Sequence, residues 1–118
     1  TGDSWRACLA REYQNQSRYH VRAGRNWGTA TVLAAKGQAA LDGEDVGPEP
    51  QASGDRDLAN ARGSLDASIA ARGQRPCECA TAQARYDSWA LAVARKISVR
   101  GAGPDWFGAA VRDCIKSR

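Results

Sequence analysis

Four cysteines in a chain of 118 residues constrain the fold more than any other feature of this sequence. Cysteines at this density, three of them on the apolar faces of predicted helices, are typical of proteins that fold in an oxidising compartment. A chain of this length forms one domain, residues 1–118, with a modest hydrophobic core. The sequence therefore predicts an exported domain stapled by two disulfides. The cysteines concerned are Cys8, Cys77, Cys79 and Cys114.

The sequence begins at Thr1 and contains no methionine. Because translation begins at methionine, we expect that further residues preceded Thr1 and were lost by cleavage of a targeting segment or by truncation. Whether they formed a signal peptide or a lipid anchor stays open. No stretch approaches the roughly 18 apolar residues that a membrane-spanning helix needs. No transmembrane segment is therefore expected in the visible chain.

Apolar residues recur at helical spacing along the chain, and no strand pattern is present. The sequence predicts an all-α fold, a compact bundle of five helices that begins with a tetratricopeptide-like hairpin. Small residues on the second helix, Ala30, Ala34 and Gly37, favour close packing of that hairpin. We expect the fourth helix to be the longest. The predicted helices cover about 4–20, 26–41, 56–72, 76–98 and 104–116, with an acidic loop at 42–54.

Charge is distributed unevenly around a formal net value of +4. Six of the thirteen acids lie between Asp42 and Asp57, and Arg56 alone opposes them. The loop 42–54 also holds Gly and Pro without any apolar periodicity, so we expect it to be a long, mobile surface loop. A hypothesis follows that this loop meets the basic residues near His20 on a neighbouring molecule and guides assembly.

The pairing of the cysteines stays open. A fifth helix antiparallel to the fourth brings Cys114 near Cys77 and Cys79, so either pairing is natural, and Cys8 takes the remaining partner. A tetrathiolate metal site is disfavoured, because zinc sites usually have CxxC knuckles in turns. Covalent haem needs CxxCH, which is absent. No metal or cofactor is expected.

No catalytic constellation is apparent, and the protein is predicted not to be an enzyme. His20 ends the first predicted helix, where the helix dipole favours a protonated imidazole, and it has no evident nucleophile as partner. Asp87 is expected on the polar side of its helix. The basic residues near His20 do not alternate with exposed aromatics and match no nucleic-acid motif, so no nucleic acid is expected as partner.

Two tryptophans lie near the ends of predicted helices and are expected to be exposed anchors for a partner, Trp5 and Trp106. Arg22 and Arg25 are the predicted charged contacts. In this interpretation rigid helices present a face, and charge sets the partner and the register.

Two alternatives remain. One is a tetratricopeptide-like module that binds an extended peptide in a groove, using Tyr13, Tyr19 and Trp27. The other is a cysteine-ligated metal carrier that uses Cys77 and Cys79 as free thiols.

Seven segments stand out by their order and spacing: GDSW, LAREY, GRNW, KGQAALDGEDVGPEP, RDLANARGSLDASIAAR, AQARYDSW and AAVRDC. Together they resemble the N-terminal helical region of OmpA-family envelope proteins of alphaproteobacterial type, over nearly the whole chain. The resemblance implies a structural or interaction module in the periplasm or outer membrane, with other cell-envelope proteins of a larger membrane-associated assembly as partners. Ser88 stands where the family often has Cys, so no disulfide pairing is carried over. The family's peptidoglycan-binding domain has no residues here, so wall binding is not implied.

Overall fold

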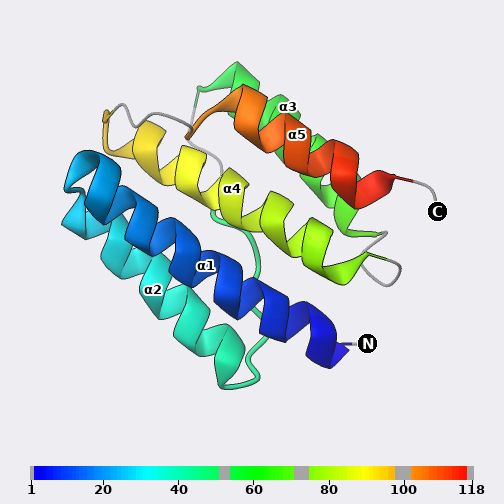
Figure 1. The fold of residues 1–118 in the computed structure, drawn as a ribbon. Helices are drawn as coiled ribbons and strands as arrows, with labels where there is room; N and C mark the ends of the chain where they lie inside the picture. The colour runs from blue at the N-terminus through cyan, green and yellow to red at the C-terminus, as the bar shows by residue number, and fades with distance from the viewer. Residues whose placement is uncertain (1, 51–53, 71–74, 98–101, 117–118) are drawn as a thin grey trace.

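The computed structural model describes residues 2–50, 54–70, 75–97 and 102–116. In these segments the chain forms five helices and no strand (Figure 1). The helices are α1 (Gly2–Gly24), α2 (Trp27–Leu41), α3 (Arg56–Ile69), α4 (Pro76–Ala94) and α5 (Pro104–Ile115). The predicted all-α bundle is confirmed.

Local sequence signals set the helix starts. The side chains of Asn26 and Asp55 cap α2 and α3 by accepting hydrogen bonds from backbone N–H groups of the first turn. Pro76 and Pro104 occupy the first turns of α4 and α5, where a missing N–H group leaves no helical bond unmade.

The helix ends differ from the prediction. α1 continues past His20 to Gly24, so α1, with 23 residues, is longer than α4, with 19. The expectation that the fourth helix is the longest is wrong. α3 ends at Ile69 and α4 at Ala94, whereas predicted residues 71–72 and 98 lie outside the described part of the chain.

α4 is the central helix of the bundle. It contacts all four other helices, with the α1–α2 hairpin on one side and α3 and α5 on the other (Figure 1). Eleven of its 19 residues are buried, so α4 has almost no outer face. α5 runs antiparallel to α4, as predicted, and α1 runs parallel to it.

Two apolar clusters flank α4. The first, towards α1 and α2, centres on Trp5, Leu9, Tyr13, Leu33, Ala80 and Ala84. The second, towards α3 and α5, centres on Leu58, Leu65, Tyr86, Trp89 and Phe107. Aromatic rings thus supply most of the bulk in a core that is otherwise rich in alanine.

Two disulfides join the helices to α4. Cys8 pairs with Cys77, linking α1 to α4, and Cys79 pairs with Cys114, linking α4 to α5. The two pairings that the sequence left open are thereby resolved. No cysteine is left as a free thiol. Two disulfides are compatible with an exported protein. Over the segments that the structure describes, no helix is both long enough and apolar enough to cross a membrane.

Gly37 marks the close crossing of α1 and α2. A Cβ atom added there would lie 3.2 Å from the backbone oxygen of Ala10 and 3.3 Å from Cβ of Tyr13. Gly37→Ala is therefore expected to destabilise the protein by about 1–3 kcal/mol, although alanine is the better helix former. Urea denaturation measures the change. In the matched control Gly63→Ala on α3, where an added Cβ atom meets nothing within 4 Å beyond its own turn of helix, we expect stabilisation by about 0.5–1 kcal/mol. Equal effects of the two substitutions would contradict the close crossing.

Candidate functional site

A buried carboxylate lies at the centre of the bundle. Asp87 on α4 is fully buried, contrary to the expectation that it lies on a polar face. Its Oδ2 accepts hydrogen bonds from Tyr13 Oη on α1, at 2.5 Å, and from Lys36 Nζ on α2, at 2.6 Å. Its Oδ1 accepts one from the backbone N–H of Glu49, at 2.7 Å. Both oxygens are therefore satisfied within the protein.

The segment from Val46 to Glu49, which we name the strap, covers this carboxylate. Glu49 binds it through the backbone N–H, and Glu49 Oε2 lies 2.7 Å from Lys36 Nζ. Gln83 Nε2, one turn before Asp87, donates to the carbonyl oxygen of Val46 at 3.0 Å. The loop that was predicted to be mobile is thus tied down at both ends of the strap. Hydrogen bonds and an ion pair hold the strap in place, so the loop needs no periodic apolar residues to stay bound.

Burial changes the proton affinity of the groups in this network. Loss of hydration raises the pKa of Asp87 above its ordinary 3.8, although the nearby Lys36 ammonium opposes the rise. Burial, together with the adjacent Asp87 charge, raises the pKa of Tyr13 well above 10.0. Tyr13 therefore acts as a neutral hydrogen-bond donor to Asp87.

A pair of buried polar side chains lies next to the network around Asp87. His20 on α1 and Ser88 on α4 are both fully buried, and Nε2 of His20 is in hydrogen-bond contact with Oγ of Ser88. The other ring nitrogen, Nδ1, meets no hydrogen-bond partner in the described part of the chain. His20 is thus an interior residue, and the prediction that it caps the end of α1 as a protonated imidazole is wrong, because α1 continues for another turn.

Burial lowers the pKa of His20 below 6.5. The unfolded chain therefore binds a proton near pH 6.5 that the folded protein does not, so the stability should fall as pH drops below 6.5. We expect a slope of at most about 1.4 kcal/mol per pH unit, the limit for one proton. Asp87, whose pKa is raised, contributes the opposite slope above pH 3.8. Urea titrations from pH 7 downwards on the protein and on His20→Gln test this. Identical pH profiles of the two proteins would contradict it.

The four predicted partner contacts do not form one surface. Trp5 is only 4% exposed and packs in the core beside Leu9, so its prediction as an exposed anchor is wrong. It lies near a helix end but on the inner face of α1. Arg22 and Arg25 are exposed at the other end of α1, and Trp106 is half-buried.

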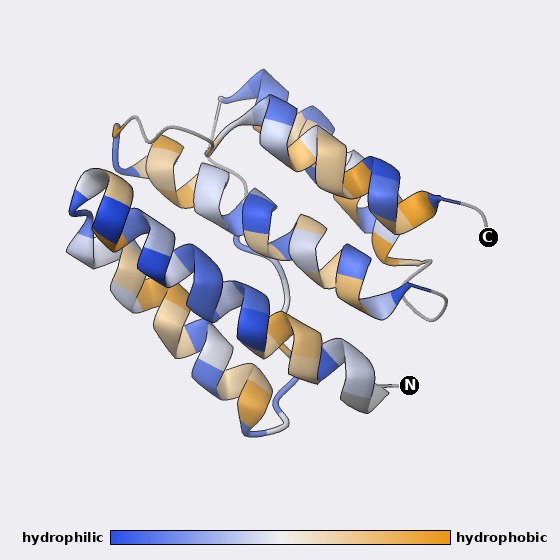
Figure 2. Cartoon of the chain, viewed as in Figure 1, coloured by the Kyte–Doolittle hydropathy of each residue, from blue (hydrophilic) through white to orange (hydrophobic). Residues whose placement is uncertain are grey.

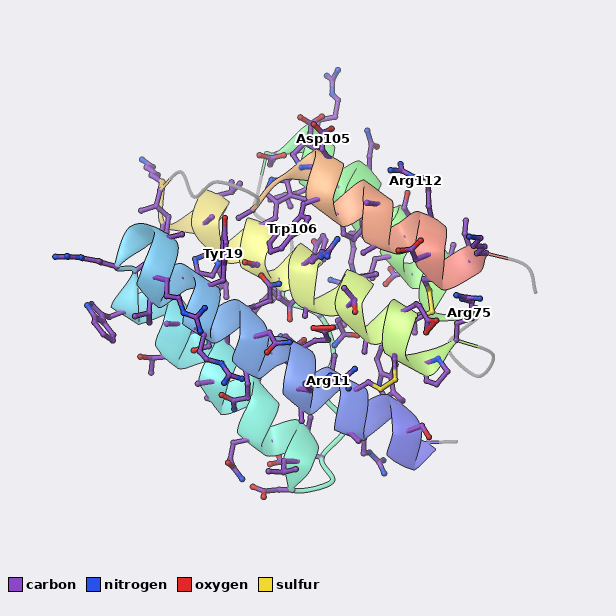
Figure 3. All side chains as sticks on the ribbon, in the orientation of Figure 1. Arg11, Tyr19, Arg75, Asp105, Trp106 and Arg112 are labelled. Carbon is purple, nitrogen blue, oxygen red and sulfur yellow. A yellow bond between two sulfur atoms is a disulfide. The ribbon has the colours of Figure 1, made fainter. Side chains whose placement is uncertain are left out.

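Trp106 is part of an ordered stack between α1 and α5. Its ring lies 5.3 Å from that of Tyr19, and the guanidinium carbon of Arg85 lies 4.5 Å from the Trp106 ring centre. Arg85 also donates to the backbone oxygen of Trp106, at 2.9 Å. Figure 3 shows Tyr19 and Trp106 meeting between the two helices. We name Tyr19, Arg85 and Trp106 the aromatic stack.

The three rings of the predicted peptide groove are separated. Tyr13 is fully buried in the polar network, Tyr19 lies against Trp106, and Trp27 alone is widely exposed, at 65%. They do not line one open groove. A shallow cavity of about 180 Å³ lies elsewhere, between the beginning of α1 and the end of α2. Its lining residues are Arg6, Ala7, Ala40, Leu41 and Gly43.

Metal ligands do not gather at any point of the described chain: no three His, Cys, Asp or Glu residues there could hold an ion. All four cysteines are oxidised in pairs, so the metal-carrier alternative lacks the free thiols that it requires.

Sequence reasoning missed the polar network, although one signal was present. Gln83 and Asp87 are spaced i,i+4 on α4, a helix in which six of the 19 residues are alanine. A helix of small residues with few charges is typical of a helix buried on all sides, where an occasional polar residue must be paired. The partners Lys36 and Glu49 carry no such local signal, because they come from distant parts of the chain.

Comparisons with protein-family models, with curated proteins and with solved structures found no match for this chain. The function is therefore argued from the geometry above.

Proposed function

We propose that this protein is a non-catalytic helical module of the periplasm or outer membrane, and that it serves as a structural or protein-interaction subunit of a larger envelope assembly. The observation that supports this most is the position of its reactive groups. His20, Ser88 and Asp87 have no exposed surface to offer a substrate. They hold α1, α2, the strap and α4 together.

The aromatic stack is the part of the surface best suited to bind a partner protein. Trp, Tyr and Arg are the residues that contribute most to protein interfaces, particularly where their side chains are already ordered. Ring packing and the hydrogen bond from Arg85 to Trp106 fix this stack before any partner arrives. Little side-chain entropy would be lost on binding.

The test compares a surface variant with an interior one in the producing cell. Trp106→Ala removes the centre of the stack and is expected to weaken association with the envelope assembly by about tenfold or more, as followed by cross-linking and mass spectrometry. Ser88→Ala removes the hydroxyl facing His20 and should leave association unchanged. Circular dichroism first establishes that both variants are folded. Loss of function in folded Ser88→Ala, with Trp106→Ala unaffected, would instead favour a catalytic interpretation.

A further inference from the structure

The whole net charge of the protein resides in its first two helices. Residues 1–41 contain six basic and two acidic residues, whereas residues 42–118 contain eleven of each. On α1 the basic side chains at positions 11, 18 and 22 are exposed and follow one helical stripe, and the exposed Arg25 lies directly after the end of the helix. Figure 2 shows this hydrophilic face of α1 turned towards the viewer.

This stripe leads to one end of the bundle, where two turns lie side by side. One turn joins α1 to α2 and the other follows α4 (Figure 1). They touch: a Cβ atom added to Gly28 would lie 2.5 Å from a guanidinium nitrogen of Arg95. At this end lie four exposed cations, Arg22 in the last turn of α1, Arg25 directly after it, and Arg95 and Lys96 after α4, together with Trp27, the first residue of α2, which is 65% exposed. We name these five residues the basic tip.

Two of the tip cations occupy unfavourable backbone positions. Arg25 has φ 50° and Lys96 has φ 56°, the only positive values among described residues other than glycine. Backbone hydrogen bonds close both turns around them, from Asn26 N to His20 O and from Ile97 N to Ala92 O, each 3.0 Å long. Glycine or asparagine is the usual residue at such a helix end, and an ordinary side chain is disfavoured there. A helix dipole favours a cation nearby but does not require one at this position.

The tip charges are also left uncompensated. None of Arg22, Arg25, Arg95 and Lys96 forms an ion pair with an acid in the part of the chain described. The exposed acids that begin the loop after α2 lie at the other end of the hairpin. Four unpaired cations and a bare indole at one protruding end attract an anionic surface rather than stabilise the fold.

We propose that the basic tip docks the protein on the surface of an anionic phospholipid bilayer. The tip lies at one end of the bundle, where the chain turns from α1 into α2 and where α4 ends, so a flat and deformable surface can reach it. Tryptophan prefers the membrane interface, where its ring enters the headgroup region and its N–H group stays hydrated. Each cation near an anionic surface strengthens binding by about fivefold at moderate ionic strength. The protein then lies on the membrane without spanning it.

The experiment uses the purified protein and vesicles of phosphatidylcholine, with or without about one third phosphatidylglycerol. Co-sedimentation at about 0.1 M salt, where charges act over about 10 Å, is expected only with the anionic vesicles and should be lost at about 1 M salt. The tip variant replaces Arg22, Arg25, Arg95 and Lys96 by Gln, and we expect it to bind at least about a hundredfold more weakly. Glutamine tolerates both positive-φ positions no worse than arginine or lysine does.

A charge-matched control separates the tip from net charge. It replaces four other exposed cations by Gln, namely Arg11, Arg56, Arg112 and Lys116. Both variants lower the formal net charge from +4 to zero, but the control should retain most of its binding. Trp27 supplies an optical readout, because Trp5 and Trp89 are buried and Trp106 is half-buried. Anionic vesicles should shift the tryptophan emission to the blue, and Trp27→Ala should abolish the shift and weaken binding by about tenfold.

Three results would overturn the proposal. Equal binding by the tip variant and the control would assign the attraction to net charge alone. Failure to bind anionic vesicles, together with binding of polyglutamate that the tip variant loses, would assign the tip to an acidic protein. The third result is self-association that depends on concentration, that the tip variant loses, and that occurs without vesicle binding. It would assign the basic tip to a second copy of this chain, as does the hypothesis that the acidic loop 42–54 meets the basic residues near His20 on a neighbouring molecule.

Discussion

Reduction of both disulfides is expected to unfold the protein at physiological temperature. The pairs Cys8–Cys77 and Cys79–Cys114 join residues that are 69 and 35 positions apart. Closing loops of these lengths in the unfolded chain contributes about 4 kcal/mol per disulfide. Domains of this size have about 5–15 kcal/mol in total, so loss of both bridges removes most of the stability. Circular dichroism in the presence of a strong reductant measures the loss of helix.

The two bridges should not be reduced together. Cys77 is partly exposed, whereas Cys79 and Cys114 are fully buried. Limited reduction followed by thiol labelling is therefore expected to label Cys8 and Cys77 first. Replacing either pair by alanine should lower stability by a similar amount, because doubling a loop changes the entropy term by only about 0.6 kcal/mol. A fully reduced protein that keeps both its helicity and its melting temperature would contradict the expected contribution.

Asp87→Ala should destabilise the protein by about 3–5 kcal/mol. The substitution removes the acceptor of Tyr13 Oη, of Lys36 Nζ and of the backbone N–H of Glu49. Lys36 then remains in a mostly buried position, and within the described segments Glu49 is the one acid still paired with it. The strap also loses one of its two hydrogen bonds to α4 and keeps the one from Gln83 to Val46, so proteolysis between residues 42 and 50 should become faster. Urea denaturation and limited proteolysis measure the two effects.

Matched variants keep this prediction testable. Asp66→Ala removes an acid from an exposed ion pair with Arg62 and should cost less than about 1 kcal/mol. In the double variant Asp87→Ala with Lys36→Met, the loss should be about 1–3 kcal/mol smaller than the sum of the single losses, because no buried cation is left without Asp87. If Asp87→Ala is too unstable to purify, Asp87→Asn is measured instead. Additive losses would show that the two side chains act independently.

Most of the helices could be predicted from local sequence. Leu58, Ala61 and Leu65 repeat at helical spacing and are three of the four buried residues of α3, and Pro76 and Pro104 lie in the first turns of their helices. These signals act over one or two turns, so neighbouring residues determine them. The end of α1 differs: the helix continues past His20 to Gly24, and His20 is an interior residue in contact with Ser88 of α4.

The residues of the candidate site were much harder to predict from the sequence than the helices. Trp5 was expected outside and lies inside, whereas Trp27, which the sequence offered only as part of a peptide groove, is the widely exposed tryptophan. Both tryptophans lie near the start of a helix. Position in the sequence alone does not show whether a side chain there points into the core or into solvent. The sequence pattern assigned Asp87 to a polar face of its helix. α4 is buried on nearly every side, so it has no polar face on which Asp87 could lie.

The sequence by itself determined the number, order and approximate limits of the helices. It also predicted that Cys114 lies near Cys77 and Cys79, the two cysteines of α4. Periodicity and capping decide these features, and both are properties of short segments. Only the tertiary structure decided which cysteines pair and that the strap within the acidic loop is bound to α2 and α4. It also decided that four cations and a tryptophan gather at one end of the bundle. Each of these depends on contacts between residues that lie far apart in the chain. The physical reason is that a buried charge such as Asp87 is stable only where several segments bring it partners at once.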